Sequence, residues 1–233
     1  MLALDLLGGA VVLYMAVIAP GVGATRYRRL LERIGGGEVG AREQFYVRSS
    51  VSKCLLTAAA GIWLGLAPWT LPFNFASAST SSTVHWLLAV TLLIGISVVI
   101  FRRTGDRQLR FLLKTAGGII PRTRRERHLF QGVCVVAGVT EEVICRWFMM
   151  SYLMGTLNLD LWGSVALSSV LFGLAHIYQG IGGVLLTGAM GAGFACIWLS
   201  TGTLLTAIVL HSLVDLRISL ILTPGRLRGL EGG

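Results

Sequence analysis

Long apolar runs separated by short polar segments dominate this chain. The runs cover residues 3–23, 51–71, 84–101, 129–154, 161–179, 181–200 and 203–223. A helix needs about 20 mostly apolar residues to cross the hydrocarbon core of a bilayer, and backbone polar groups cannot stay unpaired there. The runs are also too long and continuous for barrel strands. The pattern therefore predicts an all-α protein, a polytopic bundle of about seven transmembrane helices.

The polar segments between these runs differ in charge, and the difference predicts an orientation. Residues 24–50 and 102–128 are rich in arginine, whereas residues 72–83 are rich in serine and threonine and carry no charge. Basic residues gather in cytoplasmic loops, so we expect the N-terminus outside and the C-terminus inside. Segment 102–128 also mixes leucine and phenylalanine with arginine. It predicts an interfacial amphipathic helix on anionic lipid or, equally, a solvated loop.

Composition leaves no room for a separate soluble domain. The chain is 54% hydrophobic and 13% charged, against roughly 25% charged residues in a soluble protein. We expect N-terminal transmembrane helices with basic loops in residues 1–128, a functional core in residues 129–223 and a short tail in residues 224–233. The net charge of +9 lies mainly in the loops. The bilayer is therefore an expected partner, and nucleic acid is not.

Few ionisable residues lie well inside the apolar runs, and all of them fall in residues 129–223. They are Glu141, Glu142, Arg146, His176, His211 and Asp215. Such residues are costly in a membrane, and each raises a functional hypothesis. One buried histidine or one Glu–Arg pair is more often structural. Several of them on three helices, in a chain otherwise almost free of buried charge, indicate a functional site.

Spacing along the helices predicts two side-chain pairs. Glu142 and Arg146 are four residues apart, so they share a helix face and can form an ion pair. His211 and Asp215 have the same spacing, and the Asp215 carboxylate can accept a hydrogen bond that fixes the tautomer of His211. Glu141 lies about 100° round the helix from Glu142 and has no basic partner on its own helix. Glu141 is therefore the candidate general base for water.

Three motifs occur in a fixed order on successive helices: E-E-x-x-x-R at 141–146, F-x-x-x-H at 172–176 and H-x-x-x-D at 211–215. Together they resemble the CPBP family of CAAX proteases and bacteriocin-processing enzymes, also called the Abi family, which includes the Ras-converting CAAX endopeptidases. The resemblance covers residues 129–223 and implies an intramembrane endopeptidase. Residue 215 is less typical of the family, in which asparagine is common at this position. The difference matters because an ionised aspartate can only accept a hydrogen bond, whereas asparagine can also donate one.

The resemblance also implies a role for each motif residue. Glu141 would activate the attacking water with His176 beside it, Glu142 and Arg146 would support the site, Phe172 would contact the substrate, and His211 with residue 215 would stabilise the oxyanion. Because Asp215 cannot donate when ionised, we expect His211 to be the main donor. Asp215 would then orient His211, act in its protonated form or bind a metal.

No cofactor is favoured, because the chain lacks an H-E-x-x-H motif. The alternative is a zinc ion held by Glu141, His176 and His211. The expected substrate is a peptide or membrane-protein tail that reaches a cavity open to the cytoplasm or the inner leaflet. The short chain and loops favour a prokaryotic cytoplasmic membrane.

Two other functions compete with proteolysis. A proton-coupled transporter also needs buried acids and histidines, but such folds often carry internal repeats, and none is visible here. A non-catalytic partner of the bacteriocin-immunity type should have lost its catalytic motifs, and all three are intact.

Overall fold

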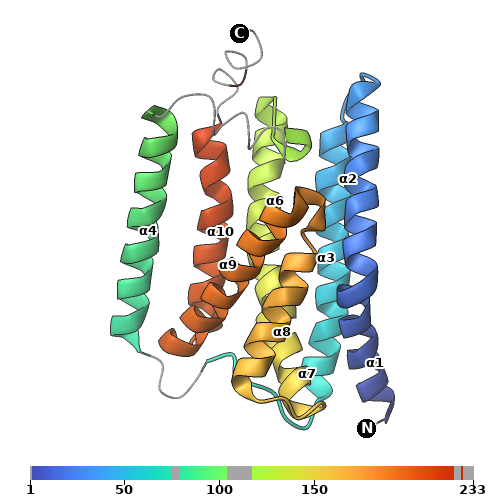
Figure 1. Cartoon of the computed structure of the whole chain (residues 1–233), viewed down its shortest axis with the longest axis vertical. Coiled ribbons are helices and arrows are strands. Elements are labelled where there is room, and N and C mark those ends of the chain that lie inside the picture. Colours follow the sequence, from blue (N-terminus) through green and yellow to red (C-terminus); the bar gives the residue numbers. More distant parts are fainter. Residues whose placement is uncertain (1, 75–78, 104–116, 223–226, 228–233) are drawn as a thin grey trace.

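The structure is a computed structural model and describes residues 2–74, 79–103, 117–222 and 227. Within these residues the chain is almost entirely helical, and its β pairing is an isolated bridge between Asn74 and Thr203. The predicted all-α fold is confirmed. Most helices run along one common axis, with α1 beginning at the lower end of the bundle and α10 ending near the upper end (Figure 1).

The helices follow one another closely along the chain. The N-terminal part contains α1 (Leu2–Leu13), the π-helical turn η1 (Tyr14–Ile18), α2 (Ala19–Gly35), α3 (Ala41–Leu66) and α4 (Thr80–Arg103). The C-terminal part contains η2 (Gly117–Ile119), α6 (Arg124–Glu142), the π-helical turn η3 (Val143–Phe148), α7 (Met149–Gly155), α8 (Leu161–Leu174), η4 (Ile177–Gln179), α9 (Gly180–Thr201) and α10 (Leu204–Ile221). Residues 104–116, which hold most of the predicted interfacial helix, lie outside the described residues.

Five helices of the described chain are long and apolar enough to cross a membrane, which makes this an integral membrane protein. They are Leu2–Gly35, Ala41–Leu66, Thr80–Phe101, Ile177–Thr201 and Leu204–Ile221. The continuous helix α6–η3–α7 carries Glu141, Glu142 and Arg146 within its apolar stretch. Helix α8 has 14 residues, or about 21 Å of rise, less than the roughly 30 Å of a hydrocarbon core. The count of seven spans stays a prediction.

Two predicted spans have the wrong ends. Span 51–71 is displaced, because α3 begins at Ala41 and ends at Leu66. Arginine, glutamate and glutamine are good helix formers, so this helix continues beyond the apolar run. Span 161–179 is too long, because α8 ends at Leu174 and Gly180 turns the chain with a φ of 78°. His176 consequently lies in the short connection between α8 and α9.

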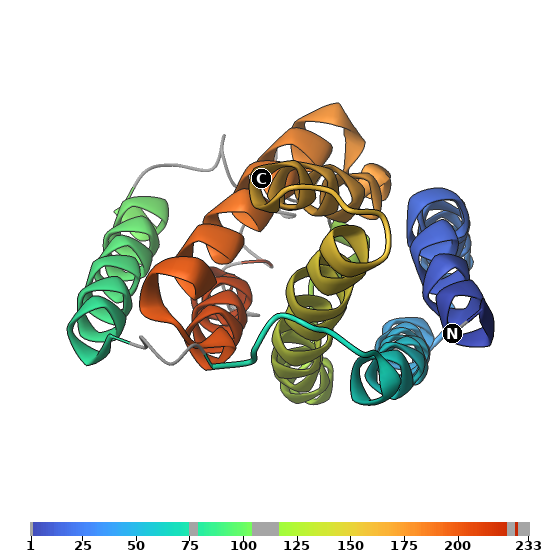
Figure 2. The ribbon, with the colours of Figure 1, turned by 90° about the horizontal axis from the view of Figure 1, so that it is seen from below.

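Helix α6 occupies the middle of the bundle. Figure 2 shows α10 and α4 on one side of it and α3 and α1 on the other. Close approach of α6 and α10 depends on Gly138, because a Cβ at this position would lie 3.0 Å from the backbone nitrogen of Ser212. Helices α8 and α9 approach in the same way at Gly173, where a Cβ would lie 2.6 Å from the Val184 carbonyl oxygen. Small residues allow such packing in membranes.

The ends of the bundle differ in charge. The last turns of α2, the start of α3 and the start of α6 lie at the upper end in Figure 1 and carry several arginines, among them Arg33, Arg42 and Arg124. The described part of the connection between α3 and α4 lies at the lower end and carries no charge. This distribution agrees with the positive-inside rule. The orientation with the N-terminus outside and the C-terminus inside stays a prediction.

Candidate active site

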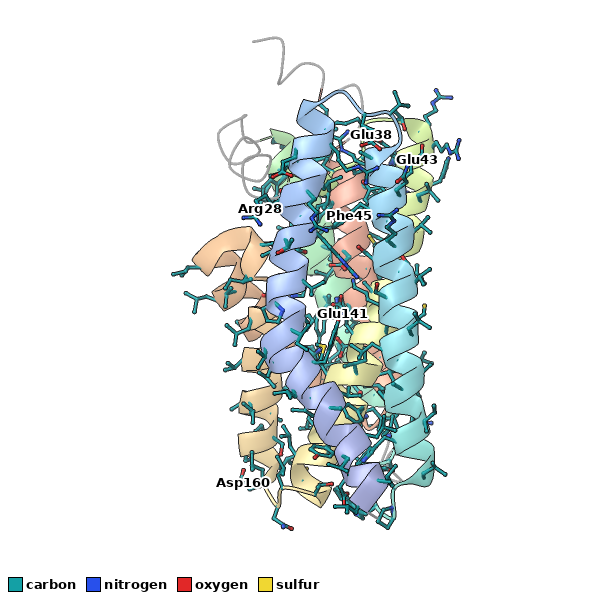
Figure 3. The ribbon with its side chains drawn as sticks, turned by 90° about the vertical axis from the view of Figure 1, so that its right-hand side faces the viewer. Arg28, Glu38, Glu43, Phe45, Glu141 and Asp160 are labelled. Atoms are coloured by element: carbon teal, nitrogen blue, oxygen red, sulfur yellow. The ribbon has the colours of Figure 1, made fainter. Side chains whose placement is uncertain are left out.

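The ionisable residues of the three motifs gather midway along the bundle, where α6 meets α3, α8 and α10. Glu141 is visible at this level, between the ribbons of α2 and α3 and far from both Glu38 and Asp160 (Figure 3). Glu141 and Glu142 are the last two residues of α6, and η3 begins directly after them. A π-helical turn inside an α-helix often marks a functional site.

Glu142 and Arg146 form the ion pair that their spacing predicts. Arg146 Nε lies 3.2 Å from Glu142 Oε2, and the two side chains are 1% and 0% exposed. The Arg146 guanidinium also lies over the Phe172 ring, with Cζ 4.5 Å from the ring centroid. Gly191 leaves room for this arrangement, because a Cβ there would lie 3.1 Å from Arg146 Nη2. Buried charge of this kind is tolerated because it is paired and covered by an aromatic face.

His211 joins the two glutamates. Its Nδ1 donates to Glu142 Oε1 at 2.7 Å, since a carboxylate can only accept. Its Nε2 lies 3.7 Å from both Glu141 Oε2 and Asp215 Oδ2. The Phe194 ring stacks on the imidazole at 4.7 Å between centroids. Glu142 therefore accepts the hydrogen bond from His211 that was expected to go to Asp215. The Asp215 carboxyl group lies beyond hydrogen-bond length, so it can act on His211 only through its charge.

Glu141 has a basic partner on another helix, which the sequence analysis missed. Lys53 of α3 places its Nζ 2.6 Å from Glu141 Oε1. The predicted start of this span at residue 51 put Lys53 at the membrane edge, whereas α3 actually begins ten residues earlier. One signal was available in the sequence, because Lys53 is one of only two lysines among twenty basic residues.

His176 is held by the backbone of its own motif. Its Nδ1 lies 2.9 Å from the Phe172 carbonyl oxygen, so Nδ1 donates and Nε2 is the free acceptor of the neutral ring. The Phe172 ring packs edge-on against His176 at 4.9 Å and against His211 at 6.0 Å between centroids. Phe172 is buried in the core, and it also borders the cavity between α2 and α3.

A cavity of about 220 Å³ leads to this group from the side of α2 and α3. Its lining includes Lys53, Glu141, Phe172 and His176, together with apolar and aromatic residues of η1, α2, α3 and α6. A second hollow lies between α2 and α3 and is lined by the four arginines Arg26, Arg29, Arg33 and Arg48. The two hollows share Arg26, Phe45, Ser49 and Ser52. The two hollows thus adjoin at these residues, and the mostly apolar cavity continues from the α2–α3 groove to Lys53 and Glu141.

The residues suggested for zinc do not fit a metal in this arrangement. Within the described parts of the chain, no three His, Cys, Asp or Glu side chains stand where they could hold an ion together. The Lys53 ammonium contacts Glu141, which would have been one of the ligands. The preference for a metal-free site stays a prediction.

Comparison with known proteins gives a match to a family model, and it covers the segment that contains the three motifs. No curated protein and no solved structure gives a match. Residues 126–217, which hold Glu141, Glu142, Arg146, His176, His211 and Asp215, match the family model described as type II CAAX prenyl endopeptidase Rce1-like. The resemblance inferred from the three motifs is thereby confirmed for this segment, which is similar to the Rce1-like CAAX endopeptidases.

Proposed function

We propose that the protein is an intramembrane endopeptidase that hydrolyses a peptide bond in a membrane-associated peptide or protein tail. The observation that carries the proposal is the position of Glu141. Its carboxylate is part of the wall of a cavity that reaches the groove between two helices, and His176 borders the same cavity. Water and an extended peptide can therefore meet at a fixed carboxylate inside an otherwise apolar bundle.

Glu141 is the general base in this proposal. Lys53 holds Oε1, and Oε2 has no hydrogen-bond partner among the described residues. Oε2 takes a proton from water as the water oxygen attacks the carbonyl carbon of the substrate. The same proton then passes to the leaving nitrogen when the C–N bond breaks. The neutral Nε2 of His176 accepts a hydrogen bond from the water and orients it.

His211 stabilises the oxyanion of the tetrahedral intermediate. Its Nδ1 proton is committed to Glu142, so only a proton on Nε2 can be offered to the substrate. Glu141 and Asp215 lie on the Nε2 side at 3.7 Å, and a doubly protonated ring would be attracted to all three carboxylates. Asp215 thus adds a further acceptor on the Nε2 side of His211, and Arg146 holds Glu142 in place.

The proposal is tested with purified protein in liposomes and a library of quenched peptides that carry a membrane-proximal cleavage site. We expect cleavage by the wild type and none by a Glu141→Gln/His211→Gln control, and we expect cleavage to persist in a chelator. Loss of cleavage in the chelator would replace the glutamate mechanism by a metal-dependent one. Absence of cleavage by folded wild type would refute the peptidase and favour a binding or transport role.

Replacing His211 by leucine is expected to lower kcat by about 10²–10³-fold, the usual effect of losing one oxyanion donor. His211→Gln should retain part of this activity, because the glutamine amide can donate a hydrogen bond. Initial rates across substrate concentrations, with folded protein measured in parallel, separate kcat from KM. An unchanged kcat with a raised KM would show that His211 only binds the substrate.

Substrate access between α2 and α3 predicts that joining these helices stops turnover. Arg26 Nη1 of α2 donates to Ser52 Oγ of α3 at 3.0 Å, so the two positions face each other across the groove. Cysteines placed at 26 and 52, with Cys54 and Cys196 replaced by alanine, should allow inhibition by a short bifunctional thiol reagent. A reagent with one reactive end is the control. Full activity after complete cross-linking would place the route elsewhere.

A further inference from the structure

Lys53 is a residue of the site to which none of the three motifs gives a role. It lies on α3, outside the matched segment 126–217, and none of the three motifs contains it. Its Nζ is nevertheless 2.6 Å from Glu141 Oε1, and both residues line the cavity. The other lysine of the chain, Lys114, lies outside the described residues, so Lys53 is the single lysine of the described structure.

We propose that Lys53 is a positioning residue for peptide hydrolysis, holding one oxygen of Glu141 so that the other faces the water. This inference rests on the function proposed above. A carboxylate that is free to rotate about its last torsion presents either oxygen in many directions. The Lys53 ammonium fixed to Oε1 removes that freedom. It leaves Oε2 on the side of His211, where the substrate carbonyl must lie.

Each of the two adjacent glutamates forms an ion pair with a basic side chain, but the two pairs differ in how far they are buried. Glu142 is paired with Arg146 and both are buried, with exposures of 0% and 1%, whereas the side chains of Glu141 and Lys53 are 13% and 33% exposed. His211 lies between the two glutamates and approaches each of them. The buried pair suits a structural support, and the pair at the cavity wall suits the group that meets water and substrate.

The choice of lysine has a chemical reason. An ammonium is a compact point charge that can bind one carboxylate oxygen, whereas a guanidinium is a planar fork that matches both oxygens at once. An arginine at residue 53 would compete for the oxygen that must accept the proton. The geometry therefore predicts that Lys53→Arg keeps the ion pair and restores only part of the activity that Lys53→Met loses.

The kinetic test compares wild type, Lys53→Met and Lys53→Arg in liposomes. Misplacing a catalytic group costs about 10²-fold in rate, and we expect a fall of this size in kcat for Lys53→Met with KM nearly unchanged. Arg125→Met is the matched control, because it also removes a cation from an ion pair, with Glu43 at 3.2 Å on the exposed surface. A small alkylammonium ion added to Lys53→Ala should restore part of the rate.

A second measurement does not depend on activity. Thermal unfolding of wild type, Lys53→Met, Glu141→Gln and the double variant forms a double-mutant cycle. We expect the two single changes to be non-additive, which shows that the pair exists. Because both side chains border a cavity, the variants should fold. Additive effects, or a wild-type kcat in Lys53→Met, would overturn the role of Lys53 alone. Absence of cleavage by the wild type would overturn the proposed function and this role with it.

Discussion

Replacing Glu141 by glutamine is expected to lower kcat by about 10²–10⁴-fold, the range for loss of a positioned general base. The amide has nearly the shape of the carboxylate but cannot take a proton from water. Its oxygen can still accept a hydrogen bond from Lys53, and Lys53 is one-third exposed in the cavity, so it can be hydrated. The fold should therefore survive. Single-turnover cleavage of a quenched peptide measures the chemical step directly.

The comparison that isolates the base is Glu141→Asp. Aspartate keeps the carboxylate but withdraws it by one methylene, so its activity should lie between those of the wild type and Glu141→Gln. Unfolding temperatures of all three proteins in the same detergent show whether the loss is chemical. If Glu141→Gln cleaves at the wild-type rate, the base is another residue, and His176 would be the next candidate because it borders the same cavity.

Replacing Arg146 by methionine is expected to destabilise the protein by about 3–5 kcal/mol, the cost of leaving a buried charge without its partner. Glu142 is 0% exposed, and its remaining partner among the described residues is His211. Methionine cannot neutralise the carboxylate, and the position over the Phe172 ring loses its cation. Thermal unfolding in detergent, followed by circular dichroism, measures the loss. Activity should fall with it, because Glu142 also holds His211.

Two control variants sharpen this second experiment. Arg125→Met makes the same chemical change in an ion pair whose arginine side chain is 80% exposed, and such surface pairs contribute about 0–1 kcal/mol. Replacing Arg146 and Glu142 together by methionine removes both charges and should restore much of the stability without restoring activity. Equal unfolding temperatures for wild type and Arg146→Met would show that Glu142 is protonated or solvated rather than dependent on Arg146.

The three motifs could be recognised in the sequence because charged residues are rare inside membrane helices and because residues four apart lie on the same face of a helix. The pairing of Glu142 with Arg146 follows from their spacing on one helix. The all-α class follows from the length of the apolar runs, since lipid leaves the backbone no other way to satisfy its polar groups. These properties are local, so one sequence is sufficient to predict them.

Contacts between helices could not be read in this way. Lys53 is 88 residues from Glu141 in the chain, and only the packing of α3 against α6 brings their side chains within 2.6 Å. Likewise, the packing of α6 against α10 makes Glu142, rather than Asp215, the hydrogen-bond acceptor of His211. The sequence by itself determined the class of fold and the candidate residues of the three motifs, because apolar length and helical spacing are local. Only the tertiary structure decided which charge faces which, because that depends on how separate helices pack.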